Sequence, residues 1–240
     1  MEKKFTEAMK LLESKDFIGA EKIFEEIVAE YREILKKGDK DYVIVNSPQE
    51  FADLCSRQSL SSLFSGAFAA EDRKLYNELE RMKKEDPELA KEYEKIQQGL
   101  NLGSKSTREL AWLPSIFSDA QFYVGYCKFE LGDIEGAILA INEAIKMNPT
   151  KGDYYNELGF LYGKSKDFTR SNFYYKKAIE KDYLKENKTI ARSLRGLGFN
   201  LIEQGNLDEA EKMLKKSLEL EPHNETALNE LAYIKTLKDL

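Results

Sequence analysis

The sequence predicts an all-α protein built as a solenoid of stacked helix pairs. Three glycines, Gly125, Gly159 and Gly198, are spaced 34 and 39 residues apart, and each is followed by a small residue 12 positions later and by another seven positions after that. The small residues in this register are Ala137 and Ala144, Ser171 and Ala178, and Ala210 and Ser217. Small residues that recur at a fixed period are typical of helical repeats, in which neighbouring units must stack to bury their apolar faces.

Composition narrows the class of protein further. Of the 240 residues, 42% are hydrophobic and 33% are charged, which suits a soluble chain with a packed core. The net charge of −6 makes a nucleic-acid-binding surface unexpected. The sequence has no apolar run long enough to insert into a membrane and no signal-peptide core, so the expected location is cytoplasmic. The two cysteines, Cys55 and Cys127, are too few for a disulfide framework.

The first 117 residues divide into two parts. Residues 1–34 show two apolar stripes at helical spacing, separated by a short polar turn, and are expected to form one helix pair. Residues 35–117 lack the repeat register and are expected to be a helical insertion, or degenerate repeats, with a linker. Within them, a β-branched run at 42–45 precedes Ser47, Pro48 and Glu50, a pattern that predicts a capped helix start.

Two further helices are expected in the same part, a charged one over about 71–98 and another near the end. Ser106 or Thr107 is a suitable cap for a helix that carries Leu110, Trp112 and Leu113 and that Pro114 interrupts. If the segment 35–117 folds back, Trp112 and Phe117 are the side chains expected to plug a groove in the repeats.

The remaining residues, 118–240, divide into three units and a partial one. The units are 118–151, 152–185 and 191–224, with a lengthened turn between the second and the third. Residues 225–240 form the partial unit, and their polar end, with Lys235, Lys238 and Asp239, suits the capping helix that solenoids need.

These units resemble the tetratricopeptide repeat family. Its signature is a large residue, Leu-Gly and Tyr on the first helix, then Ala, a large apolar residue and Ala on the second, with a terminal Pro. The residues that carry the likeness are Val124, Gly125, Asp133, Ala137, Ile141, Ala144, Pro149, Tyr155, Leu158, Gly159, Tyr162, Asp167, Tyr175, Ala178, Leu194, Leu197, Gly198, Asn206, Ala210, Leu214 and Pro222. Residues 1–34 supply Ala8, Asp16, Ala20 and Phe24 in the same phase. Lys128, Ser171, Ser217 and Tyr183 depart from the pattern. The resemblance implies a right-handed superhelix and a role in protein–protein interaction.

The resemblance also implies where a partner binds, because in this family the first helix of each unit lines a concave groove. One position of that helix is aromatic in successive units: Tyr126, Phe160, Phe199 and Tyr233. The remaining candidates for the groove are Phe122, Phe129, Asn156, Arg192, Arg195 and Asn229. Two interpretations stay open for the aromatic rings, which either pack between adjacent helices or contact a ligand, and one ring can do both.

The groove lacks the family's carboxylate clamp, which grips the acidic C-terminal tails of chaperones. The clamp needs lysine, asparagine and arginine side chains at five positions. Here the corresponding residues are Phe122, Tyr126, Glu157, Arg192 and Gly196, and only Arg192 fits. A chaperone-tail adaptor of that type is therefore not expected.

Catalytic chemistry is not expected either. The single histidine, His223, lies in a predicted turn without a cysteine or histidine at ligand spacing, which argues against a metal site. The sequence shows no phosphate-binding glycine loop and no cofactor motif. The predicted function is an adaptor or scaffold that binds a peptide or partner helix in the groove. The alternatives are a self-associating structural subunit and a ligand or peptide sensor whose 35–117 segment regulates access to the groove.

Overall fold

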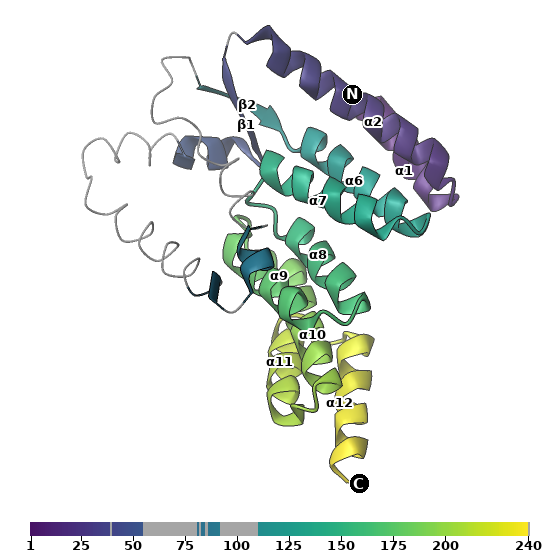
Figure 1. The fold of residues 1–240 in the computed structure, drawn as a ribbon, viewed down its shortest axis with the longest axis vertical. Helices are drawn as coiled ribbons and strands as arrows, with labels where there is room; N and C mark the ends of the chain where they lie inside the picture. Colours follow the sequence, from purple (N-terminus) through teal and green to yellow (C-terminus); the bar gives the residue numbers. More distant parts are fainter. Residues whose placement is uncertain (39, 55–80, 82, 85, 92–109, 240) are drawn as a thin grey trace, which may run out of the picture. The chain divides into compact units, whose positions relative to one another are not determined.

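The computed structural model describes residues 1–38, 40–54, 81, 83–84, 86–91 and 110–239 (Figure 1). The chain divides into two compact units. Unit 1 comprises residues 1–121 and 142–148, and unit 2 comprises residues 122–141 and 149–240. Most described residues lie in helices, so the predicted all-α fold of stacked helix pairs is confirmed.

Unit 1 begins with the expected helix pair, α1 (Glu2–Glu13) and α2 (Phe17–Lys37). Ala8, Ala20 and Phe24, which share the repeat register, are fully buried, because the small residues let the two helices approach and the ring fills the remaining space. Asp16 caps α2 by accepting a hydrogen bond from the backbone N–H of Gly19. Lys4 joins the helices through ion pairs with Glu26 and Glu30.

Unit 1 also contains a small sheet, which corrects one sequence prediction. β1 (Asp41–Val45) pairs in parallel with β2 (Leu110–Pro114), with Val43 opposite Trp112. The helix expected at Leu110–Leu113 was therefore wrong. The physical reason is that the β-branched run at 42–45 needs a hydrogen-bonding neighbour, and the segment before Pro114 supplies it.

The capped helix start predicted after this strand is confirmed. Residues 48–54 are helical, and Ser47 Oγ accepts a hydrogen bond from the backbone N–H of Glu50. The Glu50 carboxylate reaches back to the backbone and side-chain amides of Asn46, and Asn46 Oδ1 accepts a bond from Asn148. The helix start is thus tied to the end of α7 (Ile134–Met147) within unit 1. Most of the predicted helix at 71–98 lies outside the described residues, and so does Cys55.

Of the two side chains proposed as a groove plug, one is buried within unit 1. Phe117, at the start of α6 (Ile116–Glu130), is buried in unit 1 with its ring 5.6 Å from that of Tyr31. Trp112 remains 41% exposed on β2. Phe117 is therefore used as a core residue of unit 1.

Unit 2 is a run of helix pairs: part of α6 with part of α7, then α8 (Gly152–Lys164) with α9 (Phe168–Lys181), and α10 (Asn187–Glu203) with α11 (Leu207–Leu220). The repeated glycines lie where the paired helices cross. A Cβ atom on Gly125 would lie 2.7 Å from Ile141, and one on Gly198 would lie 2.9 Å from Leu214. The glycines recur in the sequence because the paired helices cross closely at these positions.

The turns inside the pairs share one backbone conformation. Gly132 and Gly205 adopt left-handed φ angles of 89° and 76°, and Lys166 adopts 59° in the same register. Each lies two positions before the first residue of the next helix. Glycine suits this conformation best, so the lysine at position 166 accepts some backbone strain.

The last helix, α12 (Glu225–Lys238), closes the array. Ala227 and Ile234 pack into the same core as Ala210 and Leu214 of α11. Lys238 forms ion pairs with Asp208 and Glu211 of α11, and hydrogen bonds from Lys215 and Lys238 lower the pKa of Glu211 to about 2. The helix therefore has the charged outer end expected of a cap.

Candidate functional site

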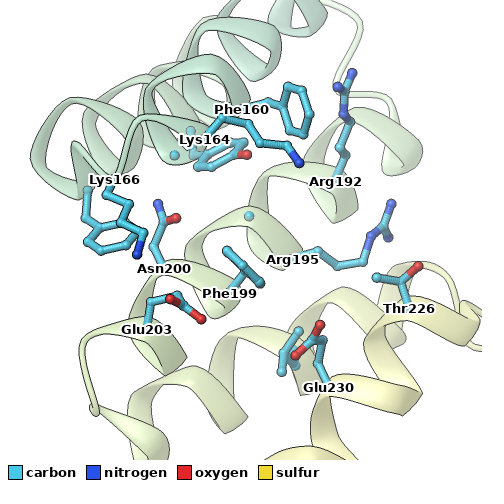
Figure 2. A pocket seen from close by; sticks show the side chains of 15 residues that line it. Phe160, Lys164, Lys166, Arg192, Arg195, Phe199, Asn200, Glu203, Thr226 and Glu230 are labelled. Atoms are coloured by element: carbon cyan, nitrogen blue, oxygen red, sulfur yellow. The ribbon is translucent and has the colours of Figure 1, made fainter.

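A hollow of about 510 Å³ lies in unit 2, along the first helices α8, α10 and α12 (Figure 2). We call it the groove cavity. It is lined by Phe160, Gly163, Lys164, Lys166, Phe168, Tyr175, Arg192, Arg195, Gly196, Phe199, Asn200, Glu203, Leu214, Thr226 and Glu230. Four of the sequence-predicted site residues, Phe160, Arg192, Arg195 and Phe199, are among them.

The walls of the groove cavity are apolar and aromatic. Phe160 of α8 is half-buried, with its ring edge-on to that of Phe129 at 5.7 Å. Phe199 of α10 is 45% exposed. Behind them lie Tyr175 and Leu214, from the second helices α9 and α11, and both are buried. The cavity can therefore accept an apolar side chain, with Phe199 as the ring that loses most water when it is covered.

Tyr175 forms the part of the floor where α8, α9 and α10 meet. Its ring lies between two glycines of successive repeats, since a Cβ atom on Gly159 or on Gly196 would lie within 2.8 Å of the ring. Burial raises the pKa of Tyr175 to about 12; Arg192 acts against this rise and Glu157 adds to it. The hydroxyl therefore stays protonated at an alkaline pH at which an exposed tyrosine ionises.

The two predicted arginines are already paired inside the protein. Arg192 donates to the buried carboxylate of Glu157 at 2.6 Å. Burial lowers the pKa of Arg192, but the charge and hydrogen bond of Glu157 outweigh it and the net pKa is raised. Arg195 pairs with Glu221 and donates to Ser217 Oγ at 3.3 Å. Their charges are largely compensated before any ligand arrives.

Other charged residues of the groove cavity were missed by the sequence reading. Lys164 Nζ lies 5.4 Å from the centre of the Phe160 ring, which is close enough for a cation–π contact. Lys166, Glu203 and Glu230 also line the cavity. The available signal was the four-residue spacing of Arg195, Phe199 and Glu203, which places them on one face of α10.

The predicted aromatic residues of α6 lie outside the lining of the groove cavity. Phe122 stacks on Tyr154, with ring centres 5.1 Å apart. Tyr126 is half-buried, and burial followed by the charge of Glu130 raises the pKa of Tyr126 above its ordinary value. For Phe122, this stacking supports the interpretation that the ring packs between adjacent helices.

The two predicted asparagines have different surroundings. Asn156 is fully buried, donates to the carbonyl of Thr189 at 3.0 Å and accepts from Ser193 Oγ at 2.6 Å. Its amide therefore joins α8 to α10. Asn229 and Tyr233 lie exposed on α12 and do not line the groove cavity.

We expect this difference to appear in stability measurements. Asn156→Ala should lower the free energy of unfolding by about 1–3 kcal/mol, because it leaves buried polar groups without partners. Asn229→Ala, the matched control at an exposed site, should change it by less than about 0.5 kcal/mol. Urea denaturation followed by circular dichroism measures both. Equal effects would mean that the Asn156 amide does not hold the helices together.

Two departures from the repeat pattern are explained by hydrogen bonds between helices. Ser171 Oγ donates to the carbonyl of Gly159 at 2.6 Å and accepts from Asn200 at 2.7 Å. Ser217 Oγ donates to the carbonyl of Ala191 at 3.1 Å. A serine at these positions keeps the small volume that the crossing needs and satisfies a carbonyl or amide near the groove cavity.

Two features are missing from the described residues. They contain no group of three or more histidine, cysteine, aspartate or glutamate residues that could hold a metal ion. Among the helices of this part of the chain, none is both long and apolar enough to cross a membrane.

Helix pairs repeated in register, with a lined groove along their first helices, define a helical-repeat protein. Family models described as tetratricopeptide repeats match residues 119–151, 152–182 and 191–224. These segments are therefore tetratricopeptide repeats, and the family resemblance seen in the sequence is confirmed for them. The matched segments coincide with the predicted units to within three residues at each end.

Solved structures of similar fold include three of interest. The first tetratricopeptide domain of Spaghetti (RPAP3), bound to the HSP90 peptide SRMEEVD, is 22% identical, covers 51% of this chain and 94% of its own, and has a TM-score of 0.46. The N-terminal domain of stress-induced protein-1 from C. elegans is 20% identical, covers 50% and 96%, and also scores 0.46. MamA is 22% identical, covers 90% and 94%, and scores 0.40. These values are too low to carry any ligand over to this chain. The comparison with curated proteins found no match.

Proposed function

We propose that this chain is a protein-interaction adaptor that receives an apolar side chain of a partner segment in the groove cavity. The observation that carries the proposal is the placement of Phe160 and Phe199 around a hollow of about 510 Å³, with Phe199 45% exposed. Exposed aromatic rings in a concave site are typical anchors of protein interfaces, because they bury a large area at a low cost in side-chain entropy.

The same geometry supports a partner other than an acidic chaperone tail. Glu157 stands where the clamp of the family has an asparagine, and it pairs with Arg192, the one clamp residue that the sequence retains. Gly196 stands where the clamp has an arginine, and the Tyr175 ring fills the space beside it. A tail bound by carboxylate contacts would have to displace Glu157 from Arg192.

The proposal is tested by capturing partners from a native extract and identifying them by mass spectrometry. The key variant is Phe199→Ala, whose ring is partly exposed, so that the fold should tolerate its loss; Phe160→Ala/Phe199→Ala is the stronger form. Leu139→Ala is the matched control, because Leu139 is 68% exposed and does not line the groove cavity. Circular dichroism first establishes that each variant is folded.

We expect partners bound by the wild type and the control to fall by about 30-fold or more with the double variant, since anchor residues commonly contribute about 2 kcal/mol or more. Partners that bind all the variants equally would overturn the groove as the binding site. The search would then move to residues 35–117 and to the outer face of the repeats.

A further inference from the structure

Two carboxylates in the groove cavity are left uncompensated. Glu203, at the end of α10, and Glu230, on α12, both line the cavity, and the side chain of neither forms a hydrogen bond or ion pair within the described part of the chain. Both side chains face the same cavity, and burial followed by the charge of Glu203 raises the pKa of Glu230 above its ordinary value, so the two carboxylates repel each other. A cation placed between them would relieve this repulsion.

An aromatic ring accompanies the two carboxylates. Phe199 lies one helical turn before Glu203 on the same face of α10, and Figure 2 shows it between the labelled Glu203 and Glu230. Its ring is 45% exposed within the cavity lining. A ring face beside carboxylates favours an ammonium or guanidinium group, which gains a cation–π contact as well as ion pairs.

The positively charged side chains of the groove cavity do not form ion pairs with Glu203 or Glu230 within the described residues. Arg192 and Arg195 are committed to Glu157 and Glu221. Lys164 lies over the Phe160 ring, and Lys166 forms no ion pair with either Glu203 or Glu230 within the described residues. Glu203 and Glu230 are therefore the charged residues of the cavity that a positively charged ligand group would complement.

We propose that Phe199, Glu203 and Glu230 bind a lysine or arginine side chain that neighbours the apolar anchor of the partner segment. This inference rests on the proposed function and adds the chemistry of the ligand to it. The groove then selects segments that are both apolar and basic and rejects segments with acidic residues at that position.

A random 12-residue peptide library displayed on phage is the probe for this preference. Selection on the wild type should enrich peptides with lysine or arginine within a few residues of a large apolar residue. The test variant is Glu203→Gln/Glu230→Gln, which keeps the shape of both side chains and removes their charge. The matched control is Glu209→Gln/Glu219→Gln, two exposed glutamates of α11 outside the groove cavity.

The strongest selected peptide then enters a double-mutant cycle measured by fluorescence anisotropy. Replacing its basic residue with norleucine should weaken binding to the wild type and to the control by about tenfold, the combined size of two exposed ion pairs and one cation–π contact. The same replacement should weaken binding to Glu203→Gln/Glu230→Gln by only about two- to fivefold, because the cation–π contact with Phe199 is all that remains to be lost.

The outcomes separate this inference from the proposed function. Apolar enrichment without basic residues, or a norleucine effect of undiminished size in Glu203→Gln/Glu230→Gln, would overturn the cation site and leave the apolar groove in place. If the same selection on Phe199→Ala enriches the same peptides as the wild type, or if no peptide is enriched at all, both the cation site and the proposed function are overturned.

Discussion

Gly196→Ala should lower the free energy of unfolding by about 1–3 kcal/mol, the usual cost of forcing an extra methyl group into a packed core. The new Cβ atom would lie 2.2 Å from Cζ of Tyr175 and 2.4 Å from its Cε2. The ring cannot move aside easily, because it is 6% exposed and Gly159 of the preceding repeat holds its other side. Helix propensity alone predicts the opposite sign, since alanine is favoured over glycine in a helix by about 1 kcal/mol.

A double-mutant cycle separates these two effects. In the Tyr175→Ala background the ring is gone, so Gly196→Ala should be neutral or should stabilise the protein by up to about 1 kcal/mol. Urea denaturation followed by circular dichroism gives the four free energies. If Gly196→Ala costs the same in both backgrounds, the clash with Tyr175 is not the reason that position 196 is glycine.

The contact between Gly196 and Tyr175 could not be predicted from the sequence, although other close helix contacts could. Periodicity identified the crossings at Gly125, Gly159 and Gly198, because a close approach of two helices requires a small residue whatever lies around it. It did not identify Gly196, whose need for glycine comes from a ring in a different helix of the preceding repeat. Non-periodic contacts of this kind follow from tertiary packing and leave no local signal.

The candidate site shows the same limit. The register of the first helices predicted Phe160, Phe199, Arg192 and Arg195 in the groove cavity, and the structure brings these four together. It did not predict that the two arginines are paired with Glu157 and Glu221, or that the buried Asn156 serves the interface between repeats. Pairing depends on distances between helices, which spacing along one helix does not contain.

Strand β2 shows a different reason for failure. The segment from Leu110 to Pro114 has helix-forming leucines and alanine, and a suitable cap precedes it. Its partner, the β-branched run at 42–45, lies more than 60 residues away in the sequence. Parallel pairing across such a separation cannot be inferred from local propensity, which tertiary context overrides here.

Phe24→Ala should lower the stability of the N-terminal helix pair by about 3–5 kcal/mol, the usual cost of removing a buried aromatic ring. Phe24 is fully buried, and its ring lies edge-on to that of Phe5 at 5.4 Å, so the truncation leaves a cavity between α1 and α2. Hydrogen exchange resolved along the chain is the suitable measurement, because it reports these two helices directly. Amides of α1 and α2 should exchange about 100-fold faster or more.

The matched control is Ile18→Ala, on the same helix. Ile18 is 72% exposed, so its truncation removes little buried surface and should change stability by less than about 0.5 kcal/mol, or about twofold in exchange rate. The contrast isolates burial, because both substitutions place alanine in α2. Similar exchange rates in the two variants would mean that Phe24 does not join α1 to α2, and the repeat register assigned to residues 1–34 would lose its main structural support.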